Sequence, residues 1–336
     1  INPKAITVSG IAANDKVYDG TNTATMNVAG AAFNGMVAGD ALSVTSAGTF
    51  ASADVAYSGG TVAAQTVTFA NTYGGADVAN YTYAGSATTT TAKVTPKALT
   101  MGSVVAANKV YDGGLAATIT SFGAFIGVVG ADAVSLDSSA YSASFATKQV
   151  ANGKAVTVLA SSLGLTGAKA GNYQLVANPT STANITAKAI TVSGIAANDK
   201  VYDGSTTAGL TTAGAVFNGM VSGDALSLSA TGTFANKTVA AGKTVTLVST
   251  YGGADLANYT ITSQASTTAS ITAKALTISG LVADSRVYDG GTAATVTNTN
   301  AMFTGLVSGD VVTVSATGVF DNVGGVAGTG KNVGTD

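Results

Sequence analysis

The sequence predicts an all-β protein made of tandem antiparallel β-sandwich domains, and three observations support that prediction. A segment of 17 residues, Lys4 to Gly20, returns unchanged at Lys188 to Gly204, and looser copies begin at Lys97 and Lys274. Apolar and polar residues alternate with a period of two between short turn signals, as in half-buried strands. The chain of 336 residues has 42 glycines and no glutamate, a composition that favours turns and strands over helices.

Four copies of the tripeptide Tyr-Asp-Gly define the length of the repeat. Its tyrosines are Tyr18, Tyr111, Tyr202 and Tyr288, so successive copies lie 93, 91 and 86 residues apart. A segment of about 90 residues can bury its own core, whereas solenoid repeats of about 20 to 50 residues depend on their neighbours. We therefore expect four domains: repeat 1 (1–96), repeat 2 (97–187), repeat 3 (188–273) and an incomplete repeat 4 (274–336).

Each complete repeat is expected to contain about seven strands. At the start of repeat 1, apolar Ile6 and Val8 alternate with hydroxyl residues, and the same alternation recurs at residues 41–45 and 244–248. Turn signals stand between such runs, for example at residues 18–20, 38–40, 73–77 and 240–243. Short strands at a spacing of about 8 to 12 residues are typical of an antiparallel sandwich.

A tyrosine that follows an aspartate by four residues refines the class of sandwich. Repeat 1 has Asp77 and Tyr81, and repeat 3 has Asp255 and Tyr259, each pair just before a predicted strand. This is the place of the tyrosine corner in immunoglobulin-like domains. Repeat 2 keeps Tyr173 but has a lysine in place of the aspartate, so we expect its corner to be held differently.

The junctions between repeats are short. Residues 183–192 connect the last strand of repeat 2 to the first strand of repeat 3 without a glycine, a serine-rich spacer or a block of charge. Pro96 stiffens the preceding junction. The expected fold is therefore all-β, with tandem immunoglobulin-like antiparallel β-sandwich domains arranged end to end as a rod.

The Tyr-Asp-Gly tripeptides favour a structural role. A buried tyrosine followed by Asp-Gly suits a tight turn after a strand, because aspartate can bond the backbone ahead and glycine accepts a positive φ. The chain has no histidine and no glutamate, so we expect no catalytic residues and no enzymatic activity. The structural motif residues are Tyr18, Asp19, Gly20, Tyr111, Asp112, Gly113, Tyr202, Asp203, Gly204, Tyr288, Asp289 and Gly290, with Asp77, Tyr81, Tyr173, Asp255 and Tyr259 at the corners.

Aspartates near the tripeptides are weak candidates for calcium ligands, because calcium takes oxygen ligands from loops. The candidates are Asp15, Asp19, Asp199 and Asp203, which belong to one repeated loop. The pattern is broken in the other two copies, where the loop contains Asn108 or Arg286. We expect no cofactor, with calcium as the weaker alternative.

Composition excludes several other classes of function. The net charge is −2 and the basic residues are scattered singly, which offers no stripe for a nucleic acid. No apolar run approaches the roughly 20 residues of a spanning helix, so membrane insertion is not expected. The absence of cysteine excludes disulfides and fits export as an unfolded chain.

The two ends of the sequence suggest a piece of a longer polypeptide. The first residue is Ile1, and no signal sequence is visible. Residues 330–333 align with residues 242–245, so the last repeat stops before its corner and its closing strand. We expect either that the polypeptide continues with more repeats or that another molecule supplies the missing strands.

These features resemble the YDG repeat, one of the "mostly bacterial" immunoglobulin-like repeats of filamentous-haemagglutinin-type surface adhesins. The resemblance rests on the opening Pro/Ala-Lys-Ala-Ile/Leu-Thr, on Val-Tyr-Asp-Gly at residues 17–20, 110–113, 201–204 and 287–290, on Gly-Asp near residues 40, 224 and 310, and on Asn-Tyr in the first three copies. It covers nearly the whole chain.

The resemblance implies a non-enzymatic structural stalk of a large secreted bacterial adhesin or biofilm-matrix protein, located outside the cell or on the bacterial cell surface. A repeat subunit of a self-assembling extracellular filament or sheath is the alternative. The candidate partners are neighbouring repeats of the same chain, other copies in a matrix or filament, and a polysaccharide or host surface. Nucleic acid and membrane insertion are not among the expected partners.

Overall fold

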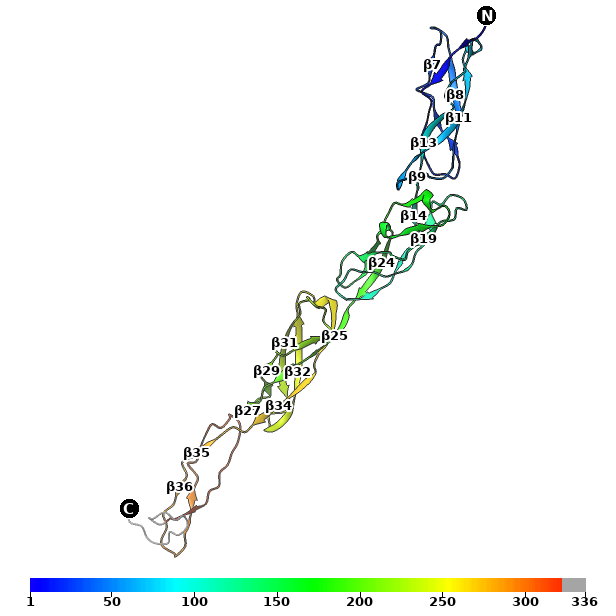
Figure 1. Cartoon of the computed structure of the whole chain (residues 1–336). Helices are drawn as coiled ribbons and strands as arrows, with labels where there is room; N and C mark the ends of the chain where they lie inside the picture. Colours follow the sequence, from blue (N-terminus) through cyan, green and yellow to red (C-terminus); the bar gives the residue numbers. More distant parts are fainter. Residues whose placement is uncertain (322–336) are drawn as a thin grey trace. The chain divides into compact units, whose positions relative to one another are not determined.

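The computed structural model describes residues 1–321, and in this range the regular structure consists of short β-strands and four 3₁₀ helices. The all-β class expected from the sequence is confirmed. The strands group by repeat (Figure 1), because every hydrogen-bonded sheet in the described range takes its strands from a single repeat. Repeats 1 and 2 form one compact unit, residues 1–187, and a second unit begins at Lys188.

Repeat 1 is built around the long antiparallel pair of β8 and β11. Its elements are β1 (Lys4–Ala5), β2 (Thr7–Ser9), β3 (Ala12–Ala13), β4 (Lys16–Val17), β5 (Thr23–Ala24), β6 (Met26–Asn27), β7 (Ala32–Asn34), β8 (Ser43–Phe50), β9 (Tyr57–Ser58), β10 (Thr61–Val62), β11 (Ala64–Gly74), η1 (Val78–Asn80), β12 (Tyr81–Thr82) and β13 (Thr89–Thr95). A five-stranded sheet has the order β4-β13-β11-β8-β5, and the other strands form the pairs β1-β12, β2-β7, β3-β6 and β9-β10.

Repeat 2 follows the same plan with shorter strands. Its elements are β14 (Lys97–Met101), β15 (Val105–Ala106), β16 (Lys109–Val110), β17 (Ile119–Ser121), β18 (Phe125–Ile126), β19 (Ser135–Asp137), β20 (Ala143–Phe145), β21 (Ala151–Val158), η2 (Ala160–Ser162), β22 (Gly164–Thr166), η3 (Ala170–Asn172), β23 (Tyr173–Leu175) and β24 (Thr180–Thr186). The sheets are β16-β24-β21-β20, β18-β14-β23, β15-β17 and β19-β22.

Repeat 3 again centres on a long pair, β31 and β32. Its elements are β25 (Lys188–Ser193), β26 (Ala196–Ala197), β27 (Lys200–Val201), β28 (Thr207–Ala208), β29 (Leu210–Thr211), β30 (Val216–Asn218), β31 (Ser227–Phe234), β32 (Ala240–Gly252), η4 (Leu256–Asn258), β33 (Tyr259–Thr262) and β34 (Ser266–Thr272). The sheets are β27-β34-β32-β31-β28, β30-β25-β33 and β26-β29.

Repeat 4 is described to residue 321 and contains β35 (Thr277–Ser279), β36 (Val282–Ala283), β37 (Ala293–Ala294), β38 (Val296–Thr297), β39 (Met302–Thr304) and β40 (Gly318–Val319). Between residues 274 and 321 no side chain is fully buried, and Val287 is 91% exposed. Two apolar residues of this repeat, Leu306 and Val312, are 36% and 41% exposed, and Val314 is half-buried. Residues 330–333, which align with the end of the matching turn in repeat 3, lie outside the described residues.

The pairing of strands is mixed, so the expectation of purely antiparallel sheets is wrong. In repeats 1, 2 and 3 the opening strand runs parallel to the strand that begins at the corner tyrosine, for example Lys4 opposite Tyr81. The strand before each Tyr-Asp-Gly also pairs parallel with the closing strand of its repeat. Parallel pairs need a long connection, and the residues that pair lie more than 70 positions apart in the sequence.

The alternation read from the sequence is confirmed in the strands. Ile6 and Val8 are each 3% exposed while Thr7 and Ser9 face solvent, and in β32 Val245 and Leu247 are buried between exposed threonines. The expected turn at residues 240–243 is wrong. There the register of β32 against β34 shifts between Ala240 and Lys243, and Gly242 has φ 60°, so the extra residue makes a bulge inside one strand.

Candidate functional site

All four Tyr-Asp-Gly tripeptides form the same local turn. One carboxylate oxygen of the aspartate accepts the backbone N–H two residues ahead at 2.8 Å in every copy, and the glycine has a φ between 75° and 81°. The aspartates concerned are Asp19, Asp112, Asp203 and Asp289. This is the conformation expected for Asp-Gly, because the aspartate closes a turn and the glycine tolerates a positive φ.

A basic residue three positions before each aspartate completes the turn. The ammonium or guanidinium nitrogen of Lys16, Lys109, Lys200 and Arg286 lies 2.6 to 2.8 Å from the aspartate carboxylate of its own copy. The same cation lies 5.5 to 5.9 Å from the ring centroid of a phenylalanine: Phe50, Phe145, Phe234 or Phe320. These ion pairs and cation–ring contacts were not predicted from the sequence, although the basic residue recurs in all four copies.

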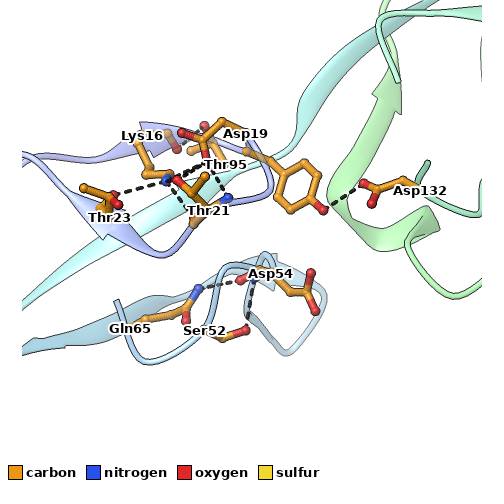
Figure 2. Close-up of polar contacts among 10 residues, drawn as sticks. Lys16, Asp19, Thr21, Thr23, Ser52, Asp54, Gln65, Thr95 and Asp132 are labelled. Atoms are coloured by element: carbon orange, nitrogen blue, oxygen red, sulfur yellow. Dashed lines mark hydrogen bonds and ion pairs between the residues drawn. The ribbon is translucent and has the colours of Figure 1, made fainter. Parts of the chain in front are cut away.

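The first joint lies between the tripeptide of repeat 1 and a loop of repeat 2. Tyr18 is 2% exposed, and its hydroxyl donates a hydrogen bond to the Asp132 carboxylate at 2.8 Å. Figure 2 shows Asp132 on a ribbon of repeat 2, separated from the cluster of Lys16, Asp19 and Thr21 by the ring whose hydroxyl it accepts. The tyrosine thus spans two repeats, whereas the aspartate after it closes the turn of its own repeat.

Asp132 is held from its own side by the corner tyrosine of repeat 2. The Tyr173 hydroxyl donates to the same carboxylate oxygen at 2.6 Å and accepts the N–H of Val129 at 2.9 Å. The rings of Tyr18 and Tyr173 meet edge to face at 5.4 Å between centroids. Both rings and Leu99 belong to one apolar cluster that includes Phe50 in the core of repeat 1, so the joint is continuous with that core.

The glycine of the tripeptide lies against the same loop. A Cβ placed on Gly20 would lie 3.0 Å from a methyl carbon of Val129, and a Cβ on Gly204 would lie 2.7 Å from a methyl carbon of Val307. Gly290 has no such neighbour within 4 Å. In repeats 1 and 3 all three residues of the motif therefore act at the joint: the tyrosine and glycine meet the next repeat, and the aspartate shapes the turn that presents them.

A second joint, inside the second unit, uses the same positions. The Tyr202 hydroxyl donates to the Asp310 carboxylate of repeat 4 at 3.0 Å, and the Lys237 ammonium lies 3.6 Å from the same oxygen. Hydrogen bonding with Tyr202 and the charge of Asp310 raise the pKa of Lys237. Asp310, like Asp132, is the last residue of a loop that begins with a valine three residues earlier. Asp132 does not follow the Gly-Asp pattern of the other copies, because Ala131 replaces the glycine, and it was therefore not predicted from the sequence.

An ion pair adds a further contact at the first joint. The Lys169 ammonium lies 2.8 and 2.9 Å from the two carboxylate oxygens of Asp54 in repeat 1, and the Asn172 amide donates to Asp54 at 2.7 Å. The N–H of Val55 donates back to the Asn172 amide oxygen at 2.8 Å. Lys169 and Asn172 lower the pKa of the Asp54 carboxyl by hydrogen bonding. Figure 2 shows that the Asp54 carboxylate points away from the Gln65 and Ser52 bonds that hold its own backbone.

The corner tyrosines have equivalent contacts in the three complete repeats. The hydroxyls of Tyr81 and Tyr259 donate to Asp40 and Asp224 at 2.5 and 2.6 Å, and each accepts a backbone N–H of the same loop at 2.9 Å. These partners lie 35 to 44 residues upstream. The partner in an immunoglobulin tyrosine corner lies only a few residues upstream, so the connection here is longer.

The aspartate before each corner also contacts the loop. The Asp77 and Asp255 carboxylates accept the N–H of Ala41 and Ala225 at 2.7 and 2.9 Å. In repeat 2 this position is Lys169, which contacts repeat 1 instead. Its corner is therefore bonded at the tyrosine as in the other repeats, and differs only at this residue.

The other motif tyrosines and the calcium candidates differ in their exposure and in their bonding partners. Tyr111 is buried, Tyr202 is half-buried and Tyr288 is 62% exposed. Among the calcium candidates, Asp15 and Asp199 accept the backbone N–H of Lys93 and Ser270 at 2.6 Å. Asp19 and Asp203 each pair with a lysine, whose hydrogen bond lowers their pKa to about 2. Across residues 1–321 no three carboxylates, imidazoles or thiols gather into a group that could hold a metal ion.

These contacts predict a broad pH range of constant stability with a loss at each end. Burial and hydrogen bonds to Asp132 or Asp224 raise the pKa of Tyr18, Tyr173 and Tyr259, the last to about 12. Their stabilisation is therefore complete below pH 10 and is lost as the pH rises through the folded-state pKa. The lowered pKa of Asp54 and Asp19 acts in the opposite direction, so that stabilisation is lost as the pH falls below about 4.

The check is the urea midpoint of unfolding measured from pH 2 to pH 12. With no histidine in the chain, we expect a constant midpoint from about pH 5 to pH 9. A step in the midpoint near pH 6 or 7 would contradict this assignment of the titrating groups. Tyr18→Phe provides the control, because it should reduce the loss above pH 10 without changing the loss in acid.

The fold and the joints define a tandem-repeat all-β protein in which one motif links two successive repeats within each of the two units. No helix within residues 1–321 has the length and apolar character needed to cross a membrane. The model of the YDG domain family matches residues 2–91, 95–183, 186–269 and 272–336. The chain belongs to the YDG domain family and is a YDG repeat protein.

Two further comparisons accompany the family match. No curated protein matches the sequence. Among solved structures, the chain is similar to domains 4–9 of the surface layer protein SbsC, with 11% sequence identity and a TM-score of 0.13. That match covers 83% of this chain and 50% of the other, so this chain spans about half the length of that structure.

Proposed function

We propose that this chain is a non-enzymatic structural stalk of a large secreted bacterial adhesin or biofilm-matrix protein, located outside the cell or on its surface. In this proposal the repeats are immunoglobulin-like sandwiches arranged end to end, and the Tyr-Asp-Gly motif is the joint that keeps them in line. The observation that carries it is the bond from the tyrosine of one repeat to the aspartate of the next, which recurs in both units.

The chemistry of the joint suits a stiff connection. A linker alone would leave successive domains free to reorient, whereas buried rings and charge-assisted hydrogen bonds fix their angle. At the first joint, the linker Pro96 lies between β13 and β14, while Tyr18, Asp54 and their partners hold the two repeats together outside the linker. A stalk needs this property in order to hold a binding region away from the cell.

Small-angle scattering of the full chain tests the stalk. Strands of about 10 to 12 residues at about 3.3 Å per residue give roughly 35 to 40 Å per repeat, so the maximum dimension should exceed about 100 Å. A radius of gyration near 20 Å, the value for a globule of about this length, would contradict the proposal. The double variant Tyr18→Ala/Tyr202→Ala should bend and broaden the distance distribution, whereas Tyr288→Ala, at an exposed tripeptide, should leave it unchanged.

A self-assembling filament or sheath subunit is the second candidate, and one observation favours it. Repeat 1 carries Asp40 and Tyr81 in the arrangement with which repeat 2 receives Tyr18. The same contact could therefore form between repeats of two different chains. Electron microscopy distinguishes the two functions, because isolated thin rods support the stalk and a regular lattice supports the filament.

A further inference from the structure

The two joints carry opposite arrangements of charge beside the shared tyrosine bond. At each joint we call the preceding repeat the outgoing repeat and the following repeat the incoming repeat. At the first joint the outgoing repeat supplies the Asp54 carboxylate and the incoming repeat supplies the Lys169 ammonium, 2.8 Å apart. At the second joint the outgoing repeat supplies Lys237 and the incoming repeat supplies Asp310, 3.6 Å apart. The common motif makes both joints possible, and these charged residues make them different.

Asp54 lies in a segment that is particular to repeat 1. Phe50 pairs with Val67 as Phe234 pairs with Val245 in repeat 3, yet the segment between the partners is six residues longer in repeat 1. The extra residues hold the β9-β10 hairpin, and the Tyr57 hydroxyl at its start donates to the carbonyl oxygen of Gly171 at 2.9 Å. The insertion therefore contacts the corner segment of repeat 2, residues 169–172, through its side chains and its backbone.

The lysine at position 169 has its bonding partner in repeat 1 and not in its own repeat. In repeats 1 and 3 the matching residue is an aspartate that accepts a loop N–H, a bond that lysine cannot accept. Lys169 instead directs its ammonium to both oxygens of Asp54. An aspartate at position 169 could accept the loop N–H of repeat 2, as in repeats 1 and 3. Its carboxylate would, however, face the Asp54 carboxylate of repeat 1.

We propose that the insertion of repeat 1 and the corner residue Lys169 form a specificity key: the outgoing face of repeat 1 accepts repeat 2 and rejects a repeat with aspartate at that position, as in repeats 1 and 3. The inference rests on the joint described under the proposed function. Residues 4–20 are identical to residues 188–204, so the tripeptide itself cannot distinguish an outgoing repeat 1 from an outgoing repeat 3. Specificity then requires a repulsive element against the wrong neighbour, which the two carboxylates provide.

The consequence concerns pairing within and between chains. Near-identical repeats in one polypeptide are prone to dock with or exchange strands with the wrong copy. A key at the first joint makes a second copy of repeat 1 or repeat 3 a poor substitute for repeat 2. The order of the repeats is then encoded by charge at the joint, beside the shared hydrogen bonds.

The test uses the full chain with a pair of spin labels, which is straightforward because the protein has no cysteine. Labels at T45C and S135C, two exposed positions on either side of the joint, report the distance between repeats 1 and 2. The variants are K169D, D54K and the swapped pair D54K/K169D. Each single change should broaden the distance distribution and raise the undocked fraction on the order of tenfold. The swapped pair should recover part of the narrow distribution, because it restores opposite charges but a lysine at position 54 cannot accept the Asn172 amide N–H.

Two further arms keep the outcomes distinct. K169D introduces the residue that repeats 1 and 3 carry, so repeat 2 should remain folded, which hydrogen exchange in β21 and β24 can verify. Y18A removes the shared part of the joint. The specificity key is overturned, and the joint is retained, if Y18A broadens the distribution and K169D does not. The same conclusion follows if the swapped pair D54K/K169D has a distribution as broad as that of D54K alone. If Y18A also leaves the distribution narrow, the joint and the proposed stalk fail together.

Discussion

Replacing Tyr259 by alanine is expected to lower the free energy of unfolding of repeat 3 by about 3 to 5 kcal/mol, the range for loss of a large buried aromatic side chain. Tyr259 is 8% exposed, donates to Asp224 at 2.6 Å and accepts the N–H of Val221 at 2.9 Å. The change removes the ring and leaves both groups without this partner. Tyr259 also joins β33 to a loop 35 to 38 residues upstream, so the loss should reach beyond its own strand.

The phenylalanine variant separates packing from hydrogen bonding. Tyr259→Phe keeps the ring and removes the hydroxyl, so the expected loss is about 1.5 to 3 kcal/mol, the range for a hydrogen bond to a charged group. Thr260→Ala, at the next and exposed residue, should cost at most about 1 kcal/mol. Hydrogen exchange of β31 and β32 in repeat 3 measures all three. Small and equal losses of free energy for both tyrosine variants would show that the corner tyrosine does not stabilise repeat 3.

Replacing Tyr18 by alanine is expected to destabilise two repeats at once. The ring is 2% exposed, so the loss in repeat 1 should be about 3 to 5 kcal/mol. Asp132 keeps Tyr173 as a donor but loses Tyr18, and Tyr173 loses the ring that packs against it edge to face. Hydrogen exchange should therefore increase in the loop of repeat 2 around residues 128–134 as well as in β4 and β13.

The matched control is the same tripeptide in repeat 4. Tyr288 is 62% exposed, so Tyr288→Ala should change the free energy of unfolding by no more than about 0.5 kcal/mol. Tyr18→Phe should reproduce only part of the loss, by about 1.5 kcal/mol, because the packing against Tyr173 at 5.4 Å remains. Unchanged exchange in the loop of repeat 2 after Tyr18→Ala would show that the tyrosine serves repeat 1 alone.

Much of the fold could be predicted because the determinants are local. Alternation at Ile6 and Val8 places them inside whichever sheet the strand joins, since successive side chains point to opposite faces. The Asp-Gly turn is likewise local, because the aspartate bonds the backbone two residues ahead and the glycine supplies a positive φ of its own. The copies of the motif then establish where each repeat begins.

The pairing of strands and the partners of the motif could not be predicted in the same way. Opening strands pair with strands more than 70 residues away, and periodicity contains no information on direction or partner. Lys169 read as a departure from the corner pattern, but its meaning depends on Asp54, which lies 115 residues earlier in another repeat. The bulge at Gly242 read as a turn, because a glycine with positive φ serves either structure.

The sequence by itself determined the all-β class, the four repeats, the exposed and buried faces of the strands and the turn at each Tyr-Asp-Gly. These properties follow from residues within a few positions of one another, so they can be read from the chain. Only the tertiary structure decided that the tyrosine of the motif bonds the next repeat, that Asp132 and Asp310 receive it, and that Asp54 and Lys169 distinguish one joint from the other. Those contacts arise when two folded repeats meet, and the residues involved lie about 110 positions apart along the chain.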